Sequence, residues 1–471
     1  DTFVSVSQAD AVDGGSGTDT IDYSGSLAGV TVRLDGTASS GGDAAGDTIL
    51  NVEHVIGSGL DDTIIGTGVN ETLEGGAGDD TLVGGSGADT LDGGAGFDTA
   101  DYSSSGGISV RMDGLAGTAG DANGDILLNI EKVIGSSLAD IIIGSANADT
   151  IVGGSGDDII SPGLGADTID GGAGNDSVDY SSSASGITLN LTNAALSTGQ
   201  AQGDTFTNVE TYILTGLDDV FVGSALAEAV QGGVGNDTLS AGDGDDSLDG
   251  GAGNDILIGG LGQDTINGGA GTDVVDYSAS SAGISINLGT GTGNTGGDAQ
   301  GDVLVVNTIE NAIGSGFDDI IVGSTAANAL TGGAGDDILV GGAGADALDG
   351  GAGLDTASYS TAAVGVVANM TTPASNTGDA AGDTYANIEN LTGSGFNDTL
   401  TGSAIANIIY GGVGADVIDG KAGNDTIYGE ESNDTIDGGA GVDVMDGGLG
   451  TDTVSFISAT SAIAASLATG T

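Results

Sequence analysis

The residues of this chain with the clearest chemistry are aspartates at the sixth position of a recurring nine-residue unit. The unit reads Gly-Gly-x-Gly-x-Asp-x-Φ-x, with Φ apolar, and one run without gaps has units starting at Gly75, Gly84 and Gly93. A carboxylate is a hard anionic oxygen donor, and Ca²⁺ binds six to eight oxygens with flexible geometry. The glycines permit positive φ, so the loop turns sharply and directs its carbonyls at an ion. The unit therefore predicts calcium-binding loops, each followed by a very short strand whose apolar residue points inward.

Twenty copies of the unit keep aspartate at the sixth position. We predict that these residues are the calcium ligands: Asp19, Asp80, Asp89, Asp98, Asp158, Asp167, Asp176, Asp237, Asp246, Asp255, Asp264, Asp273, Asp337, Asp346, Asp355, Asp416, Asp425, Asp434, Asp443 and Asp452.

Pairs of degenerate units precede the regular ones. Their fourth position has lost glycine and is mostly bulky: Leu60, Val69, Leu138, Leu217, Phe317 and Phe396. We expect these coils to pack more apolar surface and to bind calcium less regularly. Their sixth positions supply weaker metal candidates: Asp62, Asp140, Asp149, Asp219, Asp319 and Asp398.

The regular units resemble the RTX (repeats-in-toxin) family, the calcium-binding repeats of proteins exported by type I secretion. The resemblance covers most of the chain. It implies an all-β fold, a right-handed parallel β-roll or β-solenoid in which two nonapeptides form one coil. It also implies that calcium lies in the loops between successive coils.

A larger repeat is superimposed on the nonapeptides. Aromatic residues close each run of units, at Tyr23, Tyr102, Tyr180, Tyr277, Tyr359 and Phe456. Inserts of 33–37 residues follow, and each contains an alternating stretch typical of a strand, such as Val30–Leu34, and a second one, such as Asn51–Ile56. Because an insert is close to two 18-residue coils in length, we expect it to continue the sheets.

The sequence thus predicts one continuous solenoid over residues 1–471, with roughly 26 coils and a length of about 125 Å. Its super-repeats are 1–23 (partial), 24–102, 103–180, 181–277, 278–359, 360–456 and 457–471 (partial). Separate globular domains joined by disordered inserts would contradict this prediction.

The inserts contain further oxygen donors. A Gly-Asp-x-x-Gly-Asp turn recurs, and its paired aspartates either bind an additional calcium or form a polar turn: Asp43 and Asp47, Asp121 and Asp125, Asp298 and Asp302, Asp379 and Asp383. The third copy has Gln200 and Asp204 instead. A glutamate in the second strand is either another ligand or a solvated charge: Glu53, Glu131, Glu210, Glu310 and Glu389.

Composition supports an extracellular calcium protein. Four Lys and Arg stand against 69 Asp and Glu, a net charge of −65. A chain without a basic surface is excluded as a nucleic-acid binder. Cysteine is absent, and neither a secretory signal peptide nor an apolar stretch of about 20 residues that would span a membrane is present. If calcium bridges alternate units, the chain takes up roughly 15–20 Ca²⁺ ions.

We expect no enzyme and no catalytic residue, because the single histidine, His54, varies among the copies of its position. The leading prediction is a structural protein of the bacterial cell surface, such as a surface-layer subunit, adhesin stalk or filament. It would be exported by type I secretion and would self-associate, since the repeat pattern breaks off in mid-repeat at both ends. The alternatives are the calcium-binding, secretion-assisting module of a larger enzyme or toxin, and an ice- or polysaccharide-binding solenoid.

Overall fold

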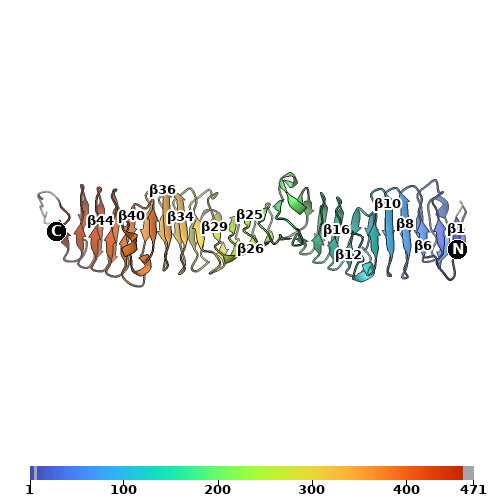
Figure 1. Ribbon diagram of the computed structural model, residues 1–471, viewed down its shortest axis with the longest axis horizontal. Coiled ribbons are helices and arrows are strands. Elements are labelled where there is room, and N and C mark those ends of the chain that lie inside the picture. The colour runs from blue at the N-terminus through green and yellow to red at the C-terminus, as the bar shows by residue number, and fades with distance from the viewer. Residues whose placement is uncertain (5–7, 460–471) are drawn as a thin grey trace. The chain divides into compact units, whose positions relative to one another are not determined.

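Short parallel strands form the whole framework of the computed structural model, which describes residues 1–4 and 8–459 (Figure 1). Over these residues there is no α-helix, and each strand has two to seven residues. The strands form because positions seven to nine of each unit alternate. In β9 (Thr81–Val83), for example, Leu82 is fully buried between two half-buried neighbours. The predicted fold class, an all-β parallel β-roll, is confirmed.

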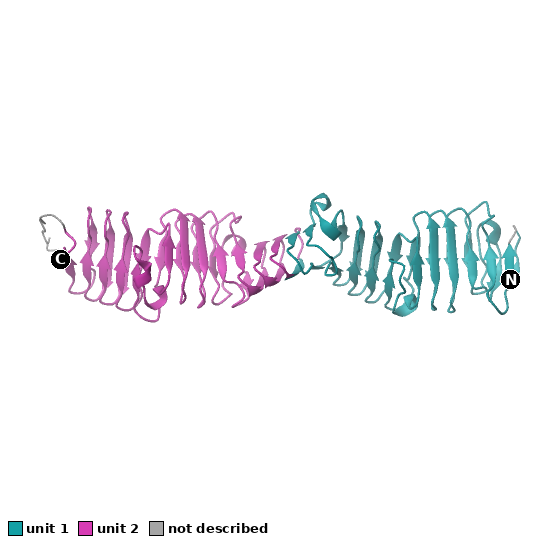
Figure 2. Ribbon diagram, viewed as in Figure 1, with its two compact units in different colours: residues 1–223, 228–233 teal, residues 224–227, 234–471 magenta. Residues whose placement is uncertain are grey.

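The described chain divides into two compact units (Figure 2). The strands of the first unit are β1 (Thr2–Val4), β2 (Ala11–Asp13), β3 (Thr20–Asp22), β4 (Thr31–Arg33), β5 (Thr48–Leu50), β6 (His54–Ile56), β7 (Thr63–Ile65), β8 (Thr72–Ala77), β9 (Thr81–Val83), β10 (Thr90–Ala95), β11 (Thr99–Asp101), β12 (Ser109–Arg111), β13 (Ile126–Leu128), β14 (Lys132–Ile134), β15 (Ile141–Ile143), β16 (Thr150–Ser155), β17 (Ile159–Ser161), β18 (Thr168–Ala173), β19 (Ser177–Asp179), β20 (Thr188–Asn190), β21 (Thr205–Thr207), β22 (Thr211–Ile213), β23 (Val220–Val222) and β24 (Ala229–Val234).

The second unit repeats the same construction. Its strands are β25 (Thr238–Asp243), β26 (Ser247–Gly253), β27 (Ile256–Leu261), β28 (Thr265–Gly271), β29 (Val274–Asp276), β30 (Ser285–Asn287), β31 (Val303–Leu304), β32 (Asn311–Ile313), β33 (Ile320–Val322), β34 (Ala329–Ala334), β35 (Ile338–Val340), β36 (Ala347–Ala352), β37 (Thr356–Ser358), β38 (Val367–Asn369), β39 (Thr384–Ala386), β40 (Asn390–Thr392), β41 (Thr399–Thr401), β42 (Ile408–Val413), β43 (Val417–Asp419), β44 (Thr426–Glu431), β45 (Thr435–Asp437), β46 (Val444–Asp446) and β47 (Thr453–Ser455).

Consecutive nonapeptides alternate between two sheets, so neighbouring strands of one sheet are two units apart. Thr72 of β8 pairs with Thr90 of β10, and Ile338 of β35 pairs with Thr356 of β37. This 18-residue register places equivalent loop residues of successive coils directly above one another. The coil of two nonapeptides that the family resemblance implied is therefore present within each of the two compact units of the fold.

Each insert contributes three strands to the roll, one more than the two predicted. In the second insert, β12 begins a new sheet, β13 ends the sheet that contains β10, and β14 continues the sheet that contains β11. We call these the start, end and through strands. They recur as β4, β5 and β6, as β20, β21 and β22, as β30, β31 and β32, and as β38, β39 and β40. The inserts continue the sheets, as expected, and each one replaces an ending sheet with a new one.

Between its start and end strands, each insert makes an excursion that folds back on the start strand through an antiparallel bridge, such as Ser109 with Ala119. Short 3₁₀ helices lie in these excursions: η1 (Gly42–Ala44), η2 (Gly120–Ala122), η3 (Ala194–Leu196), η4 (Gly199–Ala201), η5 (Gly297–Ala299), η6 (Pro373–Ser375) and η7 (Gly378–Ala380).

One packing prediction was wrong. The bulky fourth-position residues of the degenerate units do not add to the core, because they lie on the loop and point to solvent. Their exposed fractions are 45% for Leu60, 54% for Val69, 57% for Leu138, 45% for Leu217, 48% for Phe317 and 49% for Phe396.

No helix in the described ranges is long and apolar enough to cross a membrane. The single solenoid over residues 1–471 stays a prediction, and the partial repeat 457–471 lies mostly outside the described residues.

Candidate metal centre

The sixth-position carboxylates form ladders that join successive coils. The backbone N–H of Asp62 donates to Oδ1 of Asp80 at 2.7 Å, and the N–H of Asp80 donates to Oδ1 of Asp98 at 2.8 Å. All three side chains are at most 3% exposed. The 18-residue register produces this ladder, since each aspartate lies above its equivalent in the previous coil. One carboxylate oxygen of each aspartate is therefore committed to the backbone.

The other oxygen, Oδ2, is buried without a hydrogen-bond donor in most regular units of the described chain. These aspartates are Asp19, Asp80, Asp89, Asp98, Asp158, Asp167, Asp176, Asp255, Asp264, Asp273, Asp337, Asp346, Asp355, Asp416, Asp425 and Asp434. A buried carboxylate without a partner is costly, so every one of these positions requires a proton or a cation.

In several regular units a backbone carbonyl of the next coil lies close to the unpartnered oxygen. Gly75 has no side chain, and a Cβ there would lie 2.3 Å from Oδ2 of Asp80 and 2.7 Å from the carbonyl oxygen of Gly93, in the next coil. The carboxylate and the carbonyl thus face one gap between coils. No three acidic or histidine side chains converge anywhere in residues 1–4 and 8–459. A metal here would be held by one or two carboxylates together with backbone carbonyls, a donor set that fits Ca²⁺.

Four predicted ligands are not among the aspartates named above for an unpartnered Oδ2, and they lie on the same ladders. Asp237 and Asp246 are buried and donate their N–H groups to Asp255 and Asp264 at 2.8 and 3.0 Å. Asp443 and Asp452 accept the N–H groups of Asp425 and Asp434, each at 3.1 Å. Metal binding by each of the twenty aspartates is thus a proposal based on a shared geometry.

Burial changes the protonation of the ladder when no metal is bound. Removal from water raises the pKa of Asp80, Asp89, Asp158 and Asp167 to about 7, and neighbouring carboxylates add to the shift. The same burial raises the pKa of Asp337 to about 6. These carboxylates resist ionisation near neutral pH unless a cation neutralises them.

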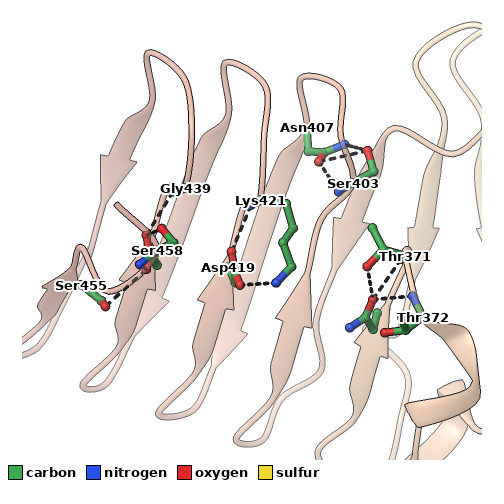
Figure 3. Close-up of polar contacts among 11 residues, drawn as sticks. Thr371, Thr372, Ser403, Asn407, Asp419, Lys421, Gly439, Ser455 and Ser458 are labelled. Carbon is green, nitrogen blue, oxygen red and sulfur yellow. Dashed lines mark hydrogen bonds and ion pairs between the residues drawn. The ribbon is translucent and has the colours of Figure 1, made fainter. Parts of the chain in front are cut away.

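The degenerate units satisfy their carboxylates with protein groups instead. Their second position is Ser or Thr, where regular units have glycine except at Lys421 and Glu430. Ser58 donates its backbone N–H to Oδ2 of Asp62 and its hydroxyl to Oδ1, and Ser136 bonds Asp140 in the same way. In the second compact unit of the fold, the backbone N–H and the hydroxyl of Ser403 both donate to Oδ1 of Asn407 (Figure 3). Metal binding at Asp62, Asp140, Asp149, Asp219, Asp319 and Asp398 stays a prediction, and the pairing with position two weighs against it.

The second aspartate of each insert turn ends a ladder. Oδ1 of Asp125 accepts the N–H of Asp89 at 2.8 Å, and its Oδ2 accepts the hydroxyl of buried Tyr102 at 2.9 Å. The same pairing joins Tyr23 to Asp47, Tyr180 to Asp204, Tyr277 to Asp302 and Tyr359 to Asp383. A tyrosine hydroxyl therefore takes the place that a cation would hold in a regular unit.

The first aspartates of the turns lie on or beside the 3₁₀ helices and are half-buried: Asp43, Asp121, Asp298 and Asp379. Asp121 accepts the hydroxyl of Ser86 at 2.9 Å. Because the second aspartate of each turn already has two donors, the turn has one carboxylate left for a shared ion. The additional metal site at this turn stays a prediction.

From the sequence we predicted the tyrosines only as boundaries and missed their role. The signal was present, since each tyrosine precedes its aspartate by 23–25 residues in all five inserts.

The raised pKa values predict that the metal-free fold depends on pH. An unfolded aspartate has a pKa near 3.8, so between about pH 4 and 7 the folded ladder binds more protons than the unfolded chain. The metal-free fold therefore loses stability as pH rises through this window. In chelator, we expect more β circular dichroism at pH 5.5 than at pH 8, and weaker calcium binding at the lower pH. Equal β content at both pH values in chelator would contradict the buried, unpartnered state of these carboxylates.

Two matched substitutions distinguish ladder positions. Asp80→Asn removes a buried charge that lacks a partner, so it should stabilise the chelated chain and destabilise the calcium-loaded chain, each by about 1–3 kcal/mol. Asp62→Asn changes a carboxylate already held by Ser58, so the number of bound calcium ions should stay the same, whereas Asp80→Asn should lose at least one. Native mass spectrometry and denaturant unfolding with and without calcium measure both effects. A loss of calcium from Asp62→Asn equal to that from Asp80→Asn would contradict the distinction.

Comparison with known protein families matches the RTX calcium-binding nonapeptide repeat, described in blocks of four copies. The matches cover residues 1–25, 65–100, 134–169, 163–182, 222–257, 250–279, 313–348, 322–357, 392–427 and 419–454, more than half of the chain. No curated protein matches the chain. The repeats of this family bind multiple Ca²⁺ ions, in agreement with the unpartnered oxygens of the ladder. The chain therefore belongs to the RTX calcium-binding repeat family.

Proposed function

We propose that this chain is a structural component of an extracellular surface, a surface-layer subunit, adhesin stalk or filament. It reaches that surface by type I secretion and folds there on binding calcium. One observation carries the proposal: every strand of the described residues belongs to the roll, and the group that recurs along it is a buried carboxylate with an oxygen that lacks a hydrogen-bond donor.

The negative charge of the chain explains why folding would require calcium. The chain carries a net charge of −65, and the ladders bury carboxylates at each coil. Extracellular modules bind calcium with dissociation constants of about 10⁻⁴–10⁻³ M, so their sites fill outside the cell and stay empty at cytosolic calcium concentrations. An unfolded, self-repelling chain suits export through a narrow channel.

A non-catalytic role is part of the proposal. His54 is half-buried, with Nε2 2.9 Å from Oε1 of Glu74 and Nδ1 3.3 Å from the hydroxyl of Thr20. Both ring nitrogens thus have partners on neighbouring strands. This arrangement supports a role in strand pairing.

Recurrent apolar side chains support self-association. The first degenerate unit after each insert presents one large apolar residue at its fourth position, about half-exposed: Leu60, Leu138, Leu217, Phe317 and Phe396. Exposed apolar groups on so acidic a chain have no folding role in the roll. Repetition once per super-repeat suits regular contacts with neighbouring chains, with calcium screening the repulsion between them.

Chelation should abolish the fold. We expect β circular dichroism to disappear when calcium is removed at low salt and neutral pH, and to return at millimolar calcium. Magnesium should not restore it, since Mg²⁺ prefers smaller, rigid octahedral sites and retains its water. Full β structure in chelator under these conditions would refute calcium-dependent folding.

Assembly should depend on the recurrent apolar residues. We expect a triple variant with serine at Leu60, Leu138 and Leu217 to fold with calcium like the wild type but to form at least tenfold fewer filaments or lattice patches in electron micrographs. The control carries serine at Leu164, Leu261 and Leu354, which are similarly exposed but lie in regular units. A wild-type chain that stays monodisperse at high concentration in millimolar calcium would contradict the proposed structural role.

A further inference from the structure

The glutamate in the through strand of each insert lies on the same ladder as the nonapeptide aspartates. Oε2 of Glu131 accepts the backbone N–H of Asp98 at 2.9 Å, as Oδ1 of Asp98 accepts the N–H of Asp80 one coil earlier. All five inserts repeat this bond, between Glu53 and Asp19, Glu131 and Asp98, Glu210 and Asp176, Glu310 and Asp273, and Glu389 and Asp355, at 2.8–3.0 Å. Each glutamate therefore extends the aspartate ladder by one step into the insert, and the ladder ends there, because the N–H of the glutamate donates to a backbone carbonyl, as Glu131 does to Asp98 at 3.1 Å.

The aspartate below each glutamate has a buried oxygen without a partner. Asp19, Asp98, Asp176, Asp273 and Asp355 are at most 2% exposed, and Oδ2 of each accepts no hydrogen bond. The backbone amide occupies only one oxygen of the glutamate carboxylate above. A second negative group thus lies over a buried negative oxygen that nothing in the protein neutralises.

A backbone carbonyl reaches the same gap. A Cβ at Gly171 would lie 2.1 Å from the carbonyl oxygen of Asn208 and 2.6 Å from Oδ2 of Asp176. A Cβ at Gly350 would lie 2.2 Å from the carbonyl oxygen of Asn387 and 2.5 Å from Oδ2 of Asp355. Regular pairs of units have this arrangement as well, with Gly93 supplying the carbonyl beside Asp80.

We propose that each insert contains one calcium site of its own, formed by the through-strand glutamate, the last aspartate of the preceding nonapeptide run and the backbone carbonyl beside it. Two carboxylates and a neutral carbonyl balance the charge of one Ca²⁺ and match its preference for oxygen donors. The site gives the insert glutamate a defined ligand role and adds five ions to the sites between regular units.

The end strand of the same insert supplies the contrast. Asp125 lies on another ladder of the same coil region, but its Oδ2 already accepts the hydroxyl of Tyr102. An insert thus binds calcium at the glutamate that extends one ladder and binds none on the tyrosine-capped oxygen that ends the other. The inference rests on calcium binding by the repeats and is independent of the structural role proposed above.

Counting bound calcium tests the proposal. A quintuple variant with glutamine at Glu53, Glu131, Glu210, Glu310 and Glu389 keeps an oxygen to accept the aspartate N–H and loses the charge. At a free calcium concentration that just saturates the wild type, we expect five fewer ions per chain by equilibrium dialysis and native mass spectrometry. An unchanged count would overturn the proposal.

The matched control replaces the tyrosine-capped aspartates Asp47, Asp125, Asp204, Asp302 and Asp383 by asparagine and should keep the wild-type count. If this control lost five ions and the glutamine variant lost none, the assignment would be reversed and the proposal wrong. A wild-type chain that bound no calcium would instead contradict calcium-dependent folding altogether, so the two failures are distinguishable.

A second measurement uses the unmodified chain and does not depend on a variant folding. In crystals grown with Tb³⁺ in place of Ca²⁺, we expect anomalous density bonded to Oδ2 of Asp98 and to Glu131, and none at Oδ2 of Asp125. Density beside Asp80 with none beside Glu131 would overturn the proposal.

Discussion

The structure depends on the two oxygens of one buried carboxylate. Along each ladder, one oxygen of the sixth-position residue accepts the backbone N–H of the equivalent residue a coil earlier, and this bond ties together coils that strand pairing holds in an 18-residue register. The same burial that makes the bond possible removes the second oxygen from water. At each rung, meaning each sixth-position residue of a ladder, the second oxygen therefore needs a hydrogen-bond donor, a proton or a cation. The residues around each aspartate determine which of these it receives.

Along a single sheet, the second carboxylate oxygen is neutralised or hydrogen-bonded in three chemically different ways. In the sheet that begins at β4, Ser58 holds Asp62 after one insert and Ser145 holds Asp149 after the next. Asp80 and Asp98, in the regular run between these inserts, each leave an oxygen for a cation. Tyr180 caps Asp204 where the sheet ends. Protein donors thus serve the first rungs after an insert and the rung that ends the sheet, whereas the aspartates between them each leave one oxygen for a cation. An exposed sheet end leaves backbone groups unpaired, so a hydroxyl donor suits the position where no further coil closes the site.

The same division separates what could be predicted from the sequence from what could not. In the nonapeptide, glycine, aspartate and an apolar residue at fixed spacing predicted a turn, a ligand and a buried strand, and the resemblance of the unit to the RTX repeats implied the roll and its coil of two nonapeptides. The tyrosine pairs were missed because Tyr102 and Asp125 are 23 residues apart and meet only after the insert folds back. The end strand was missed for the same reason, since β13 is recognisable as a strand only through its pairing with β10. The fourth-position residues were misassigned because hydrophobicity was taken to mean burial, whereas the turn directs that position outward wherever glycine is lost.

The position of the three kinds of rung determines how calcium assembles the fold. Rungs held by serine or tyrosine have protein donors at both carboxylate oxygens, so burial of these carboxylates costs less at low calcium than burial of an oxygen without a donor. The regular rungs between them each bury an oxygen without a donor, which costs free energy. At neutral pH this cost is removed when an ion binds between two adjacent coils. A sheet such as the one beginning at β4 therefore alternates rungs with protein donors, which follow each insert, with runs whose aspartates leave an oxygen for a cation up to the next insert. Since each insert starts one sheet and ends another, the serine-held rungs of the new sheet and the tyrosine-held rung of the ending sheet belong to the same insert region. We infer that calcium added to such a chain extends structure from the rungs with protein donors into the nonapeptide runs, so that the length of each run sets how far the structure must grow.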